Sequence, residues 1–291
     1  MSQNQSRDNP RGIGLMIIAM VGFTAADSFV KSASNDLPVA QILLLLGVFG
    51  GLIFALLTRA KGDAILARDF FLFPVMLRNA SEIIGTICYI TALSKIDLST
   101  ASAIIQATPL AVTFGAVVLL KERVHWRRWS AIFIGFVGVL IILRPGGSSF
   151  DVASIWAVVG MFGLAMRDLA SRMVPRDMPT LRLSTYGISM LIPAGLFLMA
   201  LGQTPQQMSL VNWGQIFSLV ILSVGGYWAI TAAMRIGDVS VVAPFRYTRI
   251  LFALVVGAIV FGERPDMWTL VGVAITIAAG LYAFLRERHR A

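Results

Sequence analysis

The chain of 291 residues is 57% hydrophobic and only 13% charged, and it carries a formal net charge of +9. About a quarter of the residues of an ordinary soluble domain are charged, so this composition excludes a typical soluble enzyme. The basic residues lie in short segments between long apolar stretches, which favours membrane topology over nucleic-acid binding as the origin of the positive charge. Stretches of about 20 apolar residues can cross the hydrocarbon core of a bilayer.

Ten apolar segments follow one another and predict ten membrane-spanning helices. They cover residues 12–31, 38–58, 70–94, 98–120, 126–144, 152–173, 181–201, 212–235, 239–261 and 267–285. Charged or helix-breaking residues separate the segments, as in the stretches 35–38 and 145–147. The links after residues 94 and 235 are very short. We therefore expect the third and fourth spans, and the eighth and ninth, to form tight helical hairpins.

The two halves of the chain are copies of each other at an offset of 141 residues, which carries Gly22 to Gly163 and Asp27 to Asp168. Further polar and proline matches in the same ungapped register are Asp36 and Asp177, Pro38 and Pro179, Asp97 and Asp238, Ser99 and Ser240, and Glu122 and Glu263. A unit of five spans crosses the membrane an odd number of times, so its two copies are inverted, as in many secondary transporters. The fold class that we predict is an all-α integral membrane protein with ten transmembrane helices, in which the repeats 1–145 and 146–291 surround a central cavity.

The basic residues are unevenly shared between the two sides of the predicted membrane. Sixteen of the 24 Lys and Arg residues lie on the side of the N-terminus, four lie in the loops of the other side, and four lie within spans. The positive-inside rule then predicts both termini in the cytoplasm and a bacterial-type cytoplasmic (inner) membrane as the location. The run 12–26 is similar to a signal peptide, but its repeat copy is internal, so we expect a retained span.

These features resemble the drug/metabolite transporter superfamily, and within it the ten-span EamA-type transporters. The resemblance covers essentially the whole chain and rests on the two five-span halves and a motif that closes the fourth and ninth spans. The motif is Leu120-Lys121-Glu122-Arg123 in the first half and Phe261-Gly262-Glu263-Arg264 in the second, and a glycine-rich span follows each copy. The resemblance implies a compact bundle that works by alternating access, driven by an ion gradient or by exchange. It leaves the solute open, because the family carries amino acids, nucleotide precursors, vitamins, quaternary amines and drugs.

Three carboxylates lie within predicted spans, where each charged residue costs roughly 2.5 to 3.5 kcal/mol on insertion scales. Asp27 and Asp168 occupy equivalent repeat positions and are candidates for proton or ion coupling, unless they are solvated or salt-bridged near helix ends. Glu82, the third candidate, lies one helical turn from Arg78 and either pairs with it or faces the cavity. Arg167 adjoins Asp168, but adjacent helical residues point about 100° apart, so we predict that Arg167 does not neutralise Asp168.

The span 239–261 contains the most distinctive segment, with Arg246 and Arg249 one turn apart and no acidic residue in the span. A guanidinium group binds a carboxylate or phosphate through two parallel hydrogen bonds, so this pair predicts a site for an anionic or zwitterionic solute. The equivalent residues of the first repeat, Ile105 and Thr108, are uncharged. Asymmetric polar groups on a symmetric scaffold are where we expect substrate specificity. The alternatives are ion pairs with the three carboxylates across the bundle, and contact with lipid headgroups.

Several other side chains complete the predicted substrate site. They are Tyr89, Gln106, Arg167, Tyr227, Trp228 and Tyr247. For the aromatic residues, packing or anchoring at the membrane interface is the alternative. Pro109 and Pro244 are expected to kink their spans and to free carbonyl groups toward a cavity or hinge. Glu122 and Glu263 are interpreted as structural residues that cap the helices following them.

The predicted function is secondary transport of a small organic solute by alternating access. Four embedded arginines against three embedded carboxylates favour an anionic or zwitterionic metabolite, such as an amino acid or an organic acid. An aromatic, vitamin-like or drug-like solute is the alternative. Two other classes are a membrane enzyme that uses Asp27 and Asp168 as a dyad, and a non-transporting sensor or scaffold.

We predict no enzymatic activity, no catalytic residues and no cofactor. The single Cys88 and the two distant histidines, His125 and His289, provide no recognisable metal site. The expected partners are a small-molecule substrate, the lipid bilayer, and a proton or a counter-transported solute. Nucleic acid is not expected, and both a monomer and a homodimer are compatible with the sequence.

Overall fold

The computed structural model describes residues 8–119, 121, 126–146, 150–175, 177–237 and 239–288, and these ranges contain helices and no β-strand. Six helical segments are long and apolar enough to cross a membrane by length and composition: Asn9–Ala33, Val39–Ala60, Leu98–Leu119, Thr180–Ala200, Leu210–Met234 and Ala243–Val260. Two shorter apolar helices cover Trp129–Leu143 and Met267–Ala283. The all-helical membrane fold that the composition predicts is confirmed.

The helices of the first half are α1 (Asn9–Ala33), α2 (Val39–Ala60), α3 (Phe73–Leu93), α4 (Leu98–Ile105), α5 (Thr108–Leu119) and α6 (Trp126–Leu143), with a 3-10 turn, η1 (Arg68–Phe71), before α3. Those of the second half are α7 (Ser154–Met173), α8 (Thr180–Ser189), α9 (Leu191–Ala200), α10 (Leu210–Ile236), α11 (Val239–Val242), the 3-10 helix η2 (Ala243–Tyr247), α12 (Thr248–Val260) and α13 (Met267–Arg288). Each predicted span matches one or more of these helices, and the ends differ by at most three residues.

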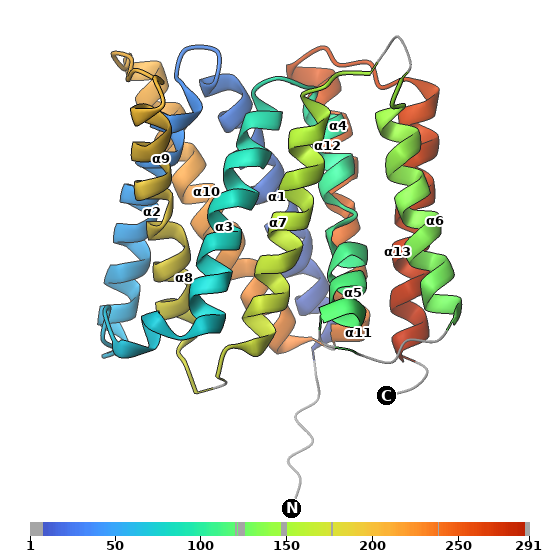
Figure 1. The fold of residues 1–291 in the computed structure, drawn as a ribbon, viewed down its shortest axis with the longest axis horizontal. Helices are drawn as coiled ribbons and strands as arrows, with labels where there is room; N and C mark the ends of the chain where they lie inside the picture. Colours follow the sequence, from blue (N-terminus) through green and yellow to red (C-terminus); the bar gives the residue numbers. More distant parts are fainter. Residues whose placement is uncertain are drawn as a thin grey trace, which may run out of the picture.

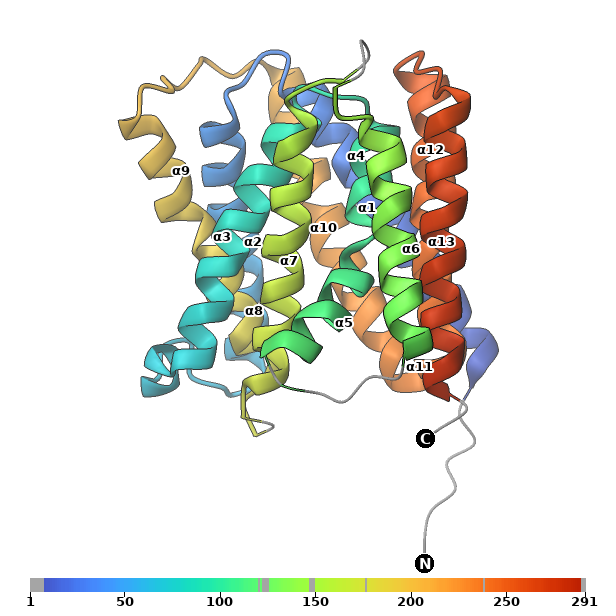
Figure 2. The ribbon, with the colours of Figure 1, turned by 45° about the vertical axis from the view of Figure 1, so that its right-hand side comes forward.

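The helices run side by side between two faces of the bundle (Figure 1). Helix α1 begins and helix α13 ends on the same face, as an even number of spans requires. We call this the terminal face. The loops 34–38, 94–97, 201–209 and 261–266 lie on the other side, which we call the opposite face. Figure 2 shows α6 and α13 packed together at one edge of the bundle.

The two halves interlock through matching helix crossings. Helix α1 packs along α10, and helix α7 packs along α3. The first helix of each half therefore lies against the third span of the other half. Gly22 faces Gly226 in one crossing and Gly163 faces Gly85 in the other. The offset of 141 residues relates both pairs, which supports an inverted duplication. Glycine at these positions lets two helix backbones approach closely.

We expect Gly163→Ala to destabilise the protein and the equivalent Gly22→Ala to be tolerated. A Cβ on Gly163 would lie 2.6 Å from the Cα of Gly85, whereas a Cβ on Gly22 would meet its nearest atom at 3.5 Å. Backbone atoms cannot rotate away, so the first change should lower the free energy of unfolding by about 1–3 kcal/mol. Thermal unfolding of the two purified variants measures the difference, and equal melting temperatures would contradict it.

The fourth and ninth spans are interrupted at equivalent positions. Helix α4 ends at Ile105 and α5 begins at Thr108, just before Pro109. Proline has no N–H to donate to the Ile105 carbonyl, and the Thr108 hydroxyl donates to that carbonyl instead. In the ninth span the backbone forms the 3-10 helix η2 around Pro244. The kinks predicted at the two prolines are confirmed.

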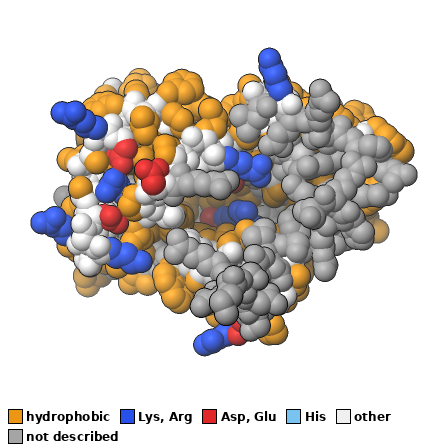
Figure 3. Space-filling view, turned by 90° about the horizontal axis from the view of Figure 1, so that it is seen from below, with side chains coloured by type: hydrophobic (Ala, Val, Ile, Leu, Met, Phe, Trp, Pro, Cys, Tyr) orange, Lys and Arg blue, Asp and Glu red, His pale blue; other side chains and the backbone are white. Residues whose placement is uncertain are grey.

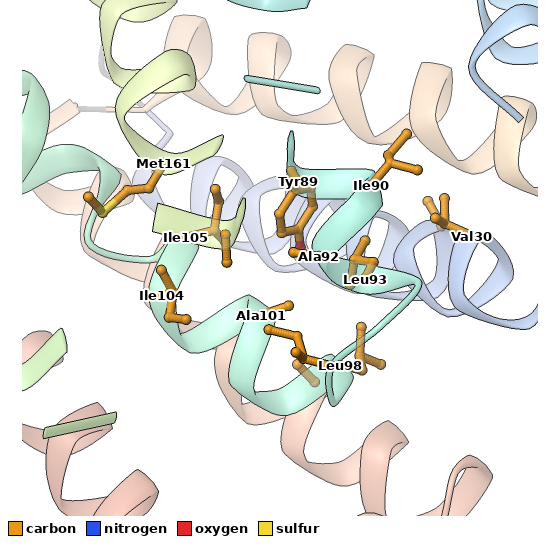
Figure 4. Packing of buried hydrophobic residues seen from close by; sticks show 14 of the residues in the cluster. Val30, Tyr89, Ile90, Ala92, Leu93, Leu98, Ala101, Ile104, Ile105 and Met161 are labelled. Atoms are coloured by element: carbon orange, nitrogen blue, oxygen red, sulfur yellow. The ribbon is translucent and has the colours of Figure 1, made fainter. Parts of the chain in front are cut away.

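The largest buried apolar cluster lies where α3 turns into α4. Figure 4 shows its side chains converging from several helices, including Leu93 of α3, Leu98 and Ile104 of α4, and Met161 of α7. Tyr89 enters the same cluster with its ring. This core holds together helices of both halves near the opposite face. Because Tyr89 is buried in it, the tyrosine hydroxyl lies among apolar groups and needs a polar partner.

Candidate functional site

Asp27 of α1, Tyr89 of α3 and Arg249 of α12 form one buried polar cluster. The Asp27 Oδ2 atom accepts hydrogen bonds from Arg249 Nη2 at 2.6 Å and from the Tyr89 hydroxyl at 3.0 Å. The Arg249 guanidinium also lies 5.6 Å from the ring centroid of Phe23. Asp27 is only 7% exposed, so its partners rather than water compensate its charge. An ion pair across the bundle, the alternative stated for the two arginines, is therefore confirmed for Arg249.

A second charged network joins α3 to α7. The Glu82 carboxylate accepts a hydrogen bond from Arg167 Nη1 at 3.2 Å and lies 3.4 Å from Arg78 Nη2, so the structure shows the first of the two alternatives for Glu82, pairing with Arg78. Arg167 Nε and Nη2 also donate to Asp168 Oδ1, at 2.9 and 2.8 Å. The prediction that Arg167 does not neutralise Asp168 is wrong. The two Cα–Cβ bonds do diverge, but the long arginine side chain bends back to reach its neighbour.

Arg246 differs from the other embedded arginines. It is partly exposed, and within the described ranges its guanidinium has no acidic partner and no hydrogen bond. Its backbone carbonyl accepts a hydrogen bond from Gln106 Nε2 at 2.9 Å. Gln106 lies in the break between α4 and α5, and Arg246 lies in η2. Two interrupted helices at equivalent positions of inverted repeats are typical of the substrate sites of secondary transporters.

The side chains of the remaining aromatic candidates contact other parts of the bundle. Tyr247 is buried against α13, where Gly280 has no side chain to obstruct the tyrosine hydroxyl. The Tyr227 hydroxyl accepts a hydrogen bond from Ser184 of α8. Tyr227 and Trp228 line a cavity of about 330 Å³ between α2, α8 and α10. Trp228 is 66% exposed, so this cavity lies at the outer surface of the bundle.

The terminal face is hollowed near its centre, and basic and acidic side chains lie within the hollow (Figure 3). Apolar side chains surround much of the rest of the described surface in this view. Burying charged groups inside an apolar bundle is unfavourable unless they have a partner or a role there. The hollow lies on the face where the repeat organisation predicts that a central cavity can open.

Glu263 caps a helix, but not the helix predicted. Its carboxylate accepts hydrogen bonds from the backbone N–H groups of Leu98 and Ser99 at 2.6 and 3.0 Å, at the first turn of α4. Burial and the neighbouring Glu263 carboxylate raise the pKa of Asp97, which precedes that turn. Glu122, the repeat equivalent of Glu263, lies outside the described residues. Ser99 recurs in the repeat as Ser240, and the sequence analysis counts this match as evidence of the duplication without predicting that Ser99 is a partner of Glu263.

An all-helical bundle of two inverted halves, with interrupted helices and buried charges at its centre, defines a multi-pass membrane transporter. The model of the EamA-like transporter family matches residues 10–144 and again residues 152–285, and the chain belongs to this family. The family resemblance inferred from the repeats and the Glu-Arg motif is confirmed.

Named relatives span nearly the whole chain. The pseudopaline exporter CntI of Pseudomonas aeruginosa (strain UCBPP-PA14) is 27% identical over 273 residues, which cover 92% of this chain and 94% of the relative. The S-adenosylmethionine uptake transporter of Rickettsia bellii (strain RML369-C) is 25% identical over 285 residues, covering 95% and 94%. A solved crystal structure covers 98% of this chain and 100% of its own, with a TM-score of 0.67 and 16% identity, and shows the same fold. The protein is therefore a transporter of a small solute.

Proposed function

We propose that the protein is a secondary transporter that carries a small anionic or zwitterionic organic solute across the cytoplasmic membrane by alternating access. The observation that supports this most directly is the guanidinium of Arg246, which has no acidic partner among the described residues and lies beside the two interrupted spans. Among the described residues, each embedded carboxylate has an arginine partner: Arg249 pairs with Asp27, and Arg78 and Arg167 share Glu82 and Asp168. One positive charge is left over, and a solute carboxylate can bind it through two parallel hydrogen bonds.

The paired charges have a second role in this proposal. A solute carboxylate that reaches Arg249 competes with Asp27, and the displaced aspartate takes up a proton because an unpaired buried charge is unfavourable. Tyr89 holds the carboxylate of Asp27 in place, and Gln106 positions Arg246 through its carbonyl. The pair Glu82 and Asp168 offers the same exchange at Arg167.

The positive-inside distribution of Lys and Arg supports an orientation with both termini in the cytoplasm. The hollow of the terminal face then opens to the cytoplasm, so the described state is inward-facing. The two relatives are named as an exporter and as an uptake transporter, so family membership leaves the direction of transport open.

Matched pairs of solutes test the substrate class. The purified protein in detergent is heated with each organic acid or amino acid and, separately, with its methyl ester, which lacks the carboxylate charge. Binding to the folded state stabilises it by about 2.7 kcal/mol at a hundredfold excess over the dissociation constant, so a bound acid raises the melting temperature. We expect acids to stabilise the protein and their esters to fail. Stabilisation by esters and acids alike would show that Arg246 does not select an anion.

An aromatic or vitamin-like solute is the second candidate, favoured by the cavity that Tyr227 and Trp228 line. Aromatic rings on one side of a cavity provide a stacking surface for a planar solute. In the same panel, this candidate predicts stabilisation by neutral aromatic solutes that is lost in Trp228→Ala and retained in Arg246→Ala.

A further inference from the structure

Glu263 connects the two halves of the molecule at the opposite face. Its Oε1 atom accepts the N–H of Leu98, and its Oε2 atom accepts both the N–H of Ser99 and, at 2.7 Å, the Ser99 hydroxyl. The Lys31 ammonium lies 3.8 Å from the same carboxylate and donates to the carbonyl of Ile96 at 2.6 Å. Glu263 is only 7% exposed. The turn after α12 is thus tied to the α3–α4 hairpin and to the end of α1.

The backbone of α12 is shaped to receive this carboxylate. A Cβ on Gly257 would lie 2.4 Å from Glu263 Oε2, closer than such atoms approach. Gly257 also accepts the backbone N–H of Glu263 through its carbonyl, at 2.9 Å. Glycine at this position therefore permits the bond between the halves. This observation does not depend on the hydrogen bonds of the carboxylate to α4.

Other contacts between the halves lie on the same face. Asn212 Nδ2 donates to Asp36 Oδ2 at 3.0 Å, and Gln41 and Gln206 exchange hydrogen bonds at 2.8 and 3.0 Å. The terminal face, by contrast, is hollowed (Figure 3). A transporter that alternates between two open states has to separate the contacts that close one face before that face opens.

We propose that Glu263 is the latch of the opposite face: it holds the α3–α4 hairpin closed in this state and has to release Leu98 and Ser99 before the face opens. The proposal rests on the alternating-access part of the proposed function. A carboxylate that accepts three short hydrogen bonds from the first turn of one helix stabilises only the state in which those hydrogen bonds exist. Weakening the latch therefore shifts the population toward the state that is open at this face.

Thiol labelling tests the latch without any knowledge of the solute. Cys88 is the single cysteine, so Cys88→Ala provides a cysteine-free background. Ser102 of α4 is fully buried one turn beyond Ser99, and Ser102→Cys introduces a near-isosteric reporter. An impermeant methanethiosulfonate is added to right-side-out and to inverted membrane vesicles. In the parent, labelling from the opposite face should be slow.

Glu263→Ala and Gly257→Ala should each raise the rate of labelling from the opposite face about tenfold. Losing the stabilisation of a helix cap shifts the equilibrium between the closed and the open state by a factor of this order. Ser99→Ala removes one of the three bonds and should have a smaller effect in the same direction. Gly257→Ala is the sharper test. Alanine favours an α-helix more than glycine does, so this change should not weaken helix α12 itself. It weakens the latch only through the volume of the added methyl group. If Glu263→Ala fails to fold, Gly257→Ala and Ser99→Ala decide the outcome.

A matched control should leave the labelling rate unchanged. Gly214→Ala is such a control, because it places a methyl group where no atom lies within 4 Å. Labelling in Gly257→Ala and Ser99→Ala that equals the parent rate would overturn the proposal. Because labelling needs no solute, that result would leave the anionic substrate class standing, and a failed solute panel would leave the latch standing.

Discussion

Arg249→Ala should destabilise the protein by about 3–5 kcal/mol, because it leaves Asp27 as an unpaired charge inside the bundle. Arg249 supplies the ionic partner of this carboxylate at 2.6 Å, and the remaining partner, the Tyr89 hydroxyl, is neutral. Asp27 is buried, so water cannot replace the lost arginine as the partner of its charge. Thermal unfolding in detergent measures the loss, and Arg59→Ala, at an exposed position in the last turn of α2, serves as the control that should not change it.

The double variant Arg249→Ala with Asp27→Asn should recover much of this stability. The second change removes the charge that the first one leaves unpaired, while the amide oxygen still accepts from Tyr89. A double-mutant cycle over the two positions isolates the coupling between the two side chains. If the double variant is as unstable as Arg249→Ala, an uncompensated aspartate is not the cause of the loss.

Arg246→Ala should have the opposite profile, with an intact fold and impaired transport. No described residue depends on its guanidinium, and removing an embedded charge relieves an insertion penalty of roughly 2.5 to 3.5 kcal/mol. The loss of charge-assisted hydrogen bonds to the solute should lower the initial uptake rate of an anionic solute about 10- to 100-fold. Arg246→Lys retains the charge without the two-pronged geometry and should be intermediate.

Uptake into proteoliposomes of an acid identified in the solute panel measures this prediction. Arg59→Ala again provides the control, since this arginine lies at the surface. Uptake by Arg246→Ala at the parent rate would rule out the arginine as the anion site. A variant with the parent melting temperature and slow uptake separates a binding role from a structural one, a distinction that Arg249→Ala cannot make.

Most of the architecture could be predicted from the residues alone. Apolar length predicts the spans because the thickness of the bilayer sets how many residues a helix needs. The repeat at an offset of 141 residues predicts the inversion, because it depends only on an odd number of spans in each copy. Pro109 and Pro244 predict the interruptions, because a missing N–H breaks a helix wherever it occurs. Each of these properties is local in sequence.

The arrangement of the charges was not accessible in the same way. Asp27 and Arg249 are 222 residues apart, and Glu263 caps a helix of the other half. Spacing along a chain shows which residues share a face of one helix, but not how that helix is rotated toward its neighbours. Rotation and helix packing bring Arg249 to a carboxylate and leave Arg246 without one in the part of the chain that the structure describes. The flexible Arg167 side chain then reaches a neighbour that helix geometry alone directs away from it.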